Sequence, residues 1–103
     1  MTGPAKMLLI FVDETDTWQD LPLYEAIVRR LVKLGAAGAT VHAGIMGYGS
    51  HGKVHRKRLF GVSDDRPITI SVIDEESRVR SLLAEVRPMV REGLVVLTDV
   101  EVV

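Results

Sequence analysis

The sequence predicts an α+β protein of the ferredoxin-like order β-α-β-β-α-β, an antiparallel four-stranded sheet with both helices on one face. Three observations predict this class. Apolar runs of strand-forming residues occur four times, two amphipathic stretches separate them, and a glycine follows each of those stretches. The length of 103 residues and the 47% hydrophobic content fit one domain, residues 1–103, with its own core.

The first half of the chain predicts a strand, a helix and a second strand. Residues 7–12, MLLIFV, form a continuous apolar run, which is typical of a strand buried on both faces. Residues 21–34 carry an apolar stripe at helical spacing. Asp20 is a candidate cap for this helix, with Pro22 in the first turn. Residues 39–46, ATVHAGIM, predict the second strand.

The second half predicts a strand, a helix and a final strand. Residues 67–74, PITISVID, form the third strand, with its proline at the first position. Asp74 is the candidate cap of the second helix, whose apolar stripe runs over 79–90. Pro88 kinks this helix or ends its regular part. Residues 94–103 predict one strand or two short ones, so an extra short C-terminal strand is allowed.

The sheet face without helices needs a separate explanation. Alternating polar residues make part of this face polar; they are Thr40, His42, Thr69 and Ser71. Strands as apolar as 7–12 nevertheless predict that the face is covered, most simply by other copies of the chain. We therefore expect a homo-oligomer, a trimer or a dimer.

Charge and composition exclude several function classes. A formal net charge of -1 provides no general attraction for nucleic acid or an anionic membrane, and the absence of cysteine excludes disulfides and thiolate metal sites. The first apolar run is too short for a secretory signal, and no run approaches the roughly 20 residues of a membrane span. We expect a cytoplasmic protein that does not bind nucleic acid.

The connection over 46–66 is the strongest functional signal from the residues themselves. It exceeds hairpin loops of roughly 2–5 residues, and it begins in the glycine-rich stretch GIMGYGSHGKVH. Glycines let backbone N–H groups approach an anion. Five cationic or donor side chains follow within six residues, namely Lys53, His55, Arg56, Lys57 and Arg58. The pattern favours a phosphate or carboxylate ligand, while a solvated loop with turn glycines is the alternative.

Three stretches together resemble a known family. LPLYEAIVRRL, GAAGATVHAGIMGYGSHGKVH and REGLVVLTDVEVV are similar to domain-of-unknown-function family 190, whose members resemble the PII signalling proteins in fold. The resemblance implies a trimer with a long, mobile T-loop at 46–66. It also implies an adenine nucleotide or another effector between subunits, and a partner that is often a membrane transporter. Relatives are paired with fluoride exporters, so a fluoride channel is a candidate partner.

The chain departs from the PII motifs in two places. Gly47-Tyr48-Gly49 matches the start of the motif at the base of the T-loop, but Lys53 stands where histidine is expected. Gly93 is followed by leucine in place of the phosphate-binding lysine. High affinity for ATP through this lysine, as in PII proteins, is therefore not expected. The predicted ligand-binding residues are Gly47, Tyr48, Gly49, Ser50, Lys53, Arg56 and Gly93.

Other chemistry is weaker in the sequence. His51 and His55 would form a two-histidine metal site of a CutA-like metal-responsive trimer. No residues show a nucleophile with a base and an orienting group, so an enzyme in the intersubunit cleft is less favoured than the metal-responsive trimer. Trp18 is expected either at an interface or over the core of its own chain.

An acidic group precedes the first helix, consisting of Asp13, Glu14, Asp16 and Asp20. Such carboxylates can bind a cation or act as a general base. Capping and solvation are the simpler explanation.

Overall fold

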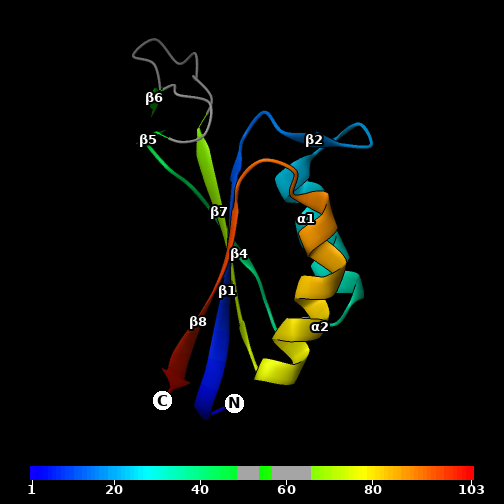
Figure 1. Cartoon of the computed structure of the whole chain (residues 1–103), viewed down its shortest axis with the longest axis vertical. Coiled ribbons are helices and arrows are strands. Elements are labelled where there is room, and N and C mark those ends of the chain that lie inside the picture. The colour runs from blue at the N-terminus through cyan, green and yellow to red at the C-terminus, as the bar shows by residue number, and fades with distance from the viewer. Residues whose placement is uncertain (49–53, 57–65) are drawn as a thin grey trace.

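The computed structural model describes residues 1–48, the strand at 54–56 and residues 66–103. A four-stranded sheet in the order β4-β7-β1-β8 carries both helices on one face (Figure 1). All neighbouring strands are antiparallel, so the predicted ferredoxin-like fold is confirmed. The strands are β1 (Gly3–Asp13), β4 (Thr40–Ala43), β7 (Pro67–Asp74) and β8 (Leu94–Val102), and the helices are α1 (Leu23–Lys33) and α2 (Glu76–Val86).

The core lies between the sheet and the helices. Alternate residues of β1 and β7 point toward the helices, and the register pairs Ile10 with Ile70 and Leu8 with Val72. Opposite them, Ile27 of α1 and Val79 of α2 are fully buried. Burying such aliphatic side chains contributes roughly 1.5–3 kcal/mol each, so this layer is the main source of stability.

The start of α1 differs from the prediction. Residues expected to be a plain connector form a small hairpin of β2 (Thr17–Trp18) and β3 (Leu21–Pro22). Gln19 and Asp20 are its two turn residues, with φ of 47° and 69°, as a two-residue hairpin of this type requires. The prediction that Asp20 caps the helix is therefore wrong. Pro22 stands at the N-cap position, and no side chain caps the helix there.

The end of α1 follows its sequence closely. The N–H of Gly35 donates to Val32 O at 3.1 Å, and the N–H of Ala36 donates to Leu31 O at 3.1 Å. These two bonds define a Schellman motif, and the φ of 78° at Gly35 is the left-handed conformation that the motif needs.

The start of α2 also differs from the prediction. Glu75 is the N-cap residue, without a side-chain cap bond, so the assignment of Asp74 as the cap is wrong. Asp74 is buried, and its carboxylate accepts hydrogen bonds from the N–H groups of Ala37 at 3.2 Å and Glu75 at 2.8 Å. At the other end, α2 stops at Val86 and a 3-10 turn, η1 (Arg87–Met89), contains Pro88, as expected for a proline.

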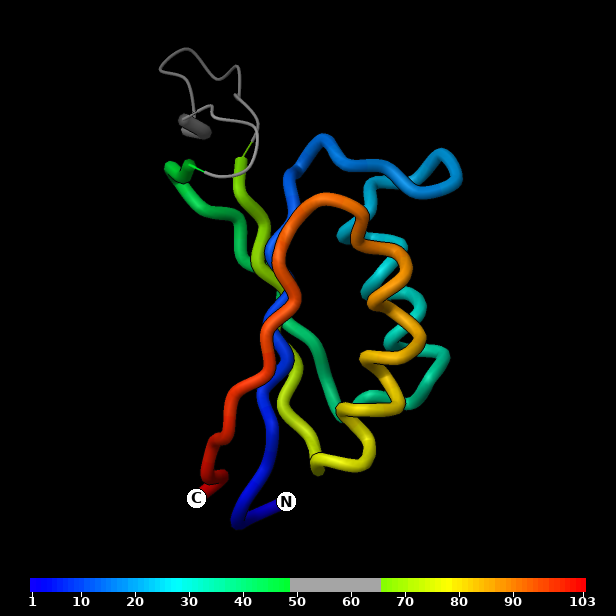
Figure 2. Tube along the Cα trace, in the orientation of Figure 1, coloured from blue at the N-terminus to red at the C-terminus, as the bar shows by residue number. Residues whose placement is uncertain are grey.

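The predicted strand 39–46 is divided. β4 ends at Ala43, and β5 (Met46–Tyr48) leaves the main sheet and pairs with β6 (Val54–Arg56). The last strand, in contrast, is one continuous element, β8. Figure 2 shows both termini at one end of the molecule and the turn before β8 at the other end. Neither described helix is long and apolar enough to cross a membrane.

The face of the sheet opposite the helices is divided by chemistry. On the β4–β7 side it presents the four polar residues expected there, with Thr40 beside Ser71 and His42 beside Thr69. On the β1–β8 side the register aligns Leu9 with Val96. The apolar residues of this side are Met7, Leu9, Phe11, Leu94 and Val96, with Ile73 from β7. We call these six residues the open apolar face.

Candidate functional site

A cleft of about 640 Å³ is lined in part by the turn before β8. Figure 2 shows this turn at the end of the molecule away from the termini. Four segments form the cleft: the C-terminal end of β1 with the turn that follows, the bend from β4 into β5, the start of β7, and the turn before β8. Its lining residues are Phe11, Val12, Asp13, Asp16, Gly44, Met46, Gly47, Tyr48, Pro67, Thr69, Glu92, Gly93 and Leu94.

Three predicted ligand-binding residues come together in this cleft. Gly47 and Tyr48 come from β5, and Gly93 comes from the turn before β8, far away in the sequence. Tyr48 is 75% exposed, so its aromatic ring is accessible to a ligand. Gly49, Ser50, Lys53 and His51 lie outside the described residues. Arg56 and His55 belong to β6, where Arg56 pairs with Met46, but their side chains are outside the description.

The glycines of the cleft permit close packing within the chain. A Cβ atom at Gly44 would lie 2.6 Å from Cγ of Pro67, and one at Gly47 would lie 2.8 Å from the same atom. Real Cβ atoms do not approach carbon atoms so closely, so both positions require glycine for the bend to pack on Pro67. Their glycine character therefore has a structural cause in addition to the backbone access that the sequence predicted.

Gly93 is more tightly constrained. Its φ is 140°, and a Cβ atom there would lie 2.2 Å from the carbonyl oxygen of Phe11. Only glycine combines this backbone conformation with this close approach. The absence of a side chain at Gly93 lets the turn before β8 lie against the end of β1, where Phe11 pairs with Leu94, and the two segments form one wall of the cleft.

The described lining is acidic. Asp13, Asp16 and Glu92 contribute three carboxylates, and none of the described lining residues is lysine, arginine or histidine. Asp13 and Asp16 also close the turn after β1. The Asp13 carboxylate accepts bonds from both the N–H and the hydroxyl of Thr15 at 2.9 Å, and Asp16 accepts the N–H of Asp13 at 2.9 Å.

The place of these carboxylates was not foreseen from the sequence. The acidic group before the first helix was visible, but Glu92 lies about eighty residues from Asp13 along the chain. Only the pairing of β1 with β8 brings the two together. The simpler explanation from the sequence, that these carboxylates cap backbone N–H groups, agrees with the hydrogen bonds of Asp13 and Asp16.

An ion pair joins the β1–β2 connection to the start of β7. Arg66 donates through Nε and Nη2 to the carboxylate of Glu14, and the Glu14 N–H donates to Arg66 O at 2.9 Å. The hydrogen bonds from Arg66 lower the pKa of Glu14, and the Coulomb attraction adds to this while partial burial opposes it. The pair fixes Arg66 at the point where the chain returns from residues 49–65.

Trp18 packs on the core of its own chain, which agrees with one of the two expectations for it. The guanidinium carbon of Arg91 lies 5.8 Å from the centre of its ring, within the range of a cation–π contact. This contact ties the β2–β3 hairpin to the turn before β8.

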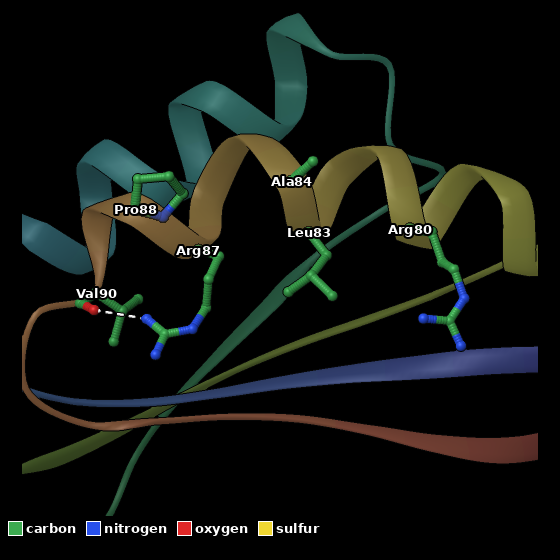
Figure 3. Close-up of a pocket in the computed structure, with 6 residues that line it drawn as sticks. All are labelled: Arg80, Leu83, Ala84, Arg87, Pro88 and Val90. Atoms are coloured by element: carbon green, nitrogen blue, oxygen red, sulfur yellow. Dashed lines mark hydrogen bonds between the residues drawn. The ribbon is translucent and has the colours of Figure 1, made fainter.

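A second hollow of about 620 Å³ lies along α2 (Figure 3). Arg80, Leu83 and Arg87 point from the helix toward the sheet there. Arg87 donates to Val90 O at 2.8 Å, and Arg80 pairs with Glu76 at 3.1 Å. Of the predicted site residues that the structure describes, Gly47, Tyr48 and Gly93 line the cleft and not this hollow, so the cleft remains the candidate site.

The structure provides no support for a metal centre within its described part, where histidine, aspartate and glutamate never gather in groups of three or more. The alternative site of His51 and His55 falls on residues whose side chains lie outside the description. That alternative stays a prediction.

Solved structures with this fold define the class of protein. CPII from Thiomonas intermedia K12, a nitrogen regulatory PII-like protein, was solved bound to ADP, AMP and bicarbonate. It shares 28% identity with this chain at a TM-score of 0.72, over 96% of this chain and 88% of CPII. A putative PII-like signalling protein from Thermus thermophilus has a TM-score of 0.70 over 98% of this chain and 91% of its own, at 18% identity. The chain therefore has the fold of the PII-like signalling proteins.

The family follows from sequence. The chain belongs to the DUF190 family, described as Uncharacterized ACR, whose profile matches residues 5–102. A UPF0166 protein of Aquifex aeolicus is 34% identical over 95% of this chain and 92% of its own length. A UPF0166 protein of Methanocaldococcus jannaschii is 33% identical over 95% of this chain and 91% of its own length. The resemblance to this family and to PII proteins is confirmed.

Proposed function

We propose that the chain is a PII-like regulatory protein whose cleft binds an adenine nucleotide as an effector. The observation that carries the proposal is the meeting of Gly47, Tyr48 and Gly93 in one cleft of about 640 Å³. Clefts of roughly 300–1,000 Å³ are typical of small-molecule sites. The ADP and AMP bound to CPII support this ligand class. The role proposed is regulation by binding, without catalysis.

We further propose that the protein acts as a trimer with the nucleotide between copies. Phe11 and Leu94 belong both to the cleft lining and to the open apolar face. A second copy that covered this face would therefore also close the cleft. Contiguous apolar surface of this kind is typical of an interface.

The partner contact is assigned to the connection between β5 and β7. Its support is the basic run from Lys53 to Arg58 in a chain of net charge -1. An acidic surface on a membrane transporter or ion channel is the partner that this charge and the family resemblance favour.

Calorimetric titration tests the proposal. The purified protein is titrated with AMP, ADP and ATP, with and without magnesium and bicarbonate. We expect saturable binding of at least one nucleotide near one site per chain. In Tyr48→Ala the affinity should fall about 5- to 100-fold, because an aromatic face under a base contributes roughly 1–3 kcal/mol.

Ile45→Ala is the matched control. Ile45 is 83% exposed and lies in the same bend, but outside the cleft lining. It should bind nucleotide as the wild type does. If the folded wild-type protein binds none of AMP, ADP and ATP under any of these conditions, the proposal is refuted.

A further inference from the structure

Helix α2 carries two stripes of side chains along its length. The first stripe is fully buried in the core and consists of Val79, Leu82 and Val86. The second stripe follows the spacing i, i+3, i+4, i+7 and consists of Arg80, Leu83, Ala84 and Arg87. We call these four residues the outer stripe. They line the hollow of about 620 Å³ along α2, so this stripe borders open space (Figure 3).

The middle of the outer stripe is apolar and only partly covered. Leu83 is partly buried against the core, and Ala84 is exposed. Val95 and Leu97 of β8 are also only partly buried, although the residues opposite them on β1 are fully buried. α2 therefore leaves the helix side of β8 partly open, and an additional apolar side chain in the hollow would gain stability by burial.

The two ends of the outer stripe differ in the balance of their charges. At one end, Arg80 pairs with Glu76 at 3.1 Å, and its charge also acts on the carboxylate of Asp99 in β8. At the other end, Arg87 donates through Nη1 to Val90 O at 2.8 Å, and this carbonyl is a neutral acceptor. A guanidinium has five N–H donors, so Arg87 can bind a carboxylate in addition to this carbonyl. The hollow is thus complementary to an apolar surface with a negative charge beside it.

We infer that the hollow along α2 is a docking site for an amphipathic helix of a partner protein, with apolar side chains over Leu83 and Ala84 and a carboxylate on Arg87. A helix suits this surface because its own side chains recur at i, i+3, i+4 and i+7. Two helices can therefore interlock over the roughly 10 Å between positions 80 and 87. The hollow lies on the helix side of the sheet, opposite the open apolar face, so copies packed on that face leave it accessible. The inference goes beyond nucleotide binding and does not depend on it.

The experiment uses two labelled synthetic peptides of about 18 residues, long enough to form a helix. The glutamate peptide has leucine along one helical face and glutamate along both borders of that face, and the lysine peptide has lysine in place of each glutamate. Fluorescence anisotropy at low ionic strength measures the affinity of each peptide for wild type, Arg87→Glu and Ala84→Glu. Ala84 is exposed, so this second variant leaves the core intact. Arg29→Glu is the control, because it reverses the same charge on α1 outside the hollow.

We expect the glutamate peptide to bind wild type and to lose about fivefold or more in affinity for Arg87→Glu, where repulsion replaces attraction. Its affinity should also fall for Ala84→Glu, because a carboxylate then lies under the leucines. Arg29→Glu should bind it as the wild type does, and the lysine peptide should bind Arg87→Glu more tightly than wild type.

This pattern supports the inference. Equal affinity of the glutamate peptide for wild type and either hollow variant overturns it, because the peptide then binds elsewhere, for example at the basic run from Lys53 to Arg58. A wild-type protein that does not bind the glutamate peptide also overturns it.

Discussion

At Gly93 the backbone of the turn before β8 runs directly against the carbonyl of Phe11. The φ of Gly93 is 140°, and a Cβ atom added there would lie 2.2 Å from the carbonyl oxygen of Phe11. Any side chain at this position must therefore displace β1 or the turn. Gly93 thus determines the shape of one cleft wall through its missing side chain. The cleft glycines of the bend, Gly44 and Gly47, do the same against Pro67.

Gly93→Ala should destabilise the protein by about 2–4 kcal/mol, because it adds both a clash and an unfavourable backbone conformation. We expect a fall in melting temperature of roughly 10 °C or more at fixed protein concentration. Gly38→Ala is the control, because nothing lies within 4 Å of a Cβ there. Equal melting temperatures for the two variants would contradict this account of Gly93.

At the scale of elements, the chain that connects β5 to β7 is held by an ion pair where it enters β7. Arg66 stands immediately before β7, and its guanidinium is held by Glu14, which follows β1. Pro67 then packs on the glycines of the bend where β4 passes into β5. The start of β7 therefore contacts both the strand that precedes the connection and the turn after β1.

The Glu14–Arg66 pair should make stability depend on pH. The pKa of Glu14 in the folded protein lies below its ordinary value of 4.5 because Arg66 donates to the carboxylate. The contribution of the pair is therefore present above about pH 4.5 and is lost as the pH falls through the lower folded pKa. Glu14→Gln should lower stability by about 1 kcal/mol at neutral pH, and the difference from wild type should vanish in acid.

Urea unfolding across this pH range provides the measurement. Glu25→Gln serves as the control, because Glu25 pairs with Arg29 on an exposed helix face and should contribute little. A constant stability difference between wild type and Glu14→Gln down to strongly acidic pH would disprove the assignment.

At the scale of the whole molecule, one side of the sheet is covered by helices and the other presents the open apolar face. Leu9 lies in the middle of that face, between Ser71 of β7 and Val96 of β8. Apolar residues there bring no benefit to an isolated chain in water. This arrangement is the physical basis for the proposed trimer.

Leu9→Asp should convert the oligomer to a monomer, because a buried, unpaired charge at an interface costs several kcal/mol. Light scattering coupled to size exclusion measures the molar mass directly. Val32→Asp is the matched control, since Val32 is 73% exposed on α1, on the other side of the molecule. A wild-type protein that is already monomeric at high concentration would refute the trimer.

The sequence by itself determined the order of elements, because hydrophobic periodicity and turn residues act locally. β7 coincides with the predicted residues 67–74, and α1 ends just before Gly35, which follows its C-cap in a Schellman motif. The family was also recognisable from three stretches, since several spacings match together. Arg56 and the other basic residues of the connection remain predictions, because the described structure does not include their side chains.

Only the tertiary structure decided how the cleft is built and charged. Asp20 became a turn residue because the connector before α1 forms a hairpin, and Asp74 became a buried acceptor because the chain after α1 passes close to it. Glu92 and Asp13 line the same cleft because β8 pairs with β1. Hydrogen bonds and strand pairing between distant segments create these contacts, and no local pattern in the sequence records them.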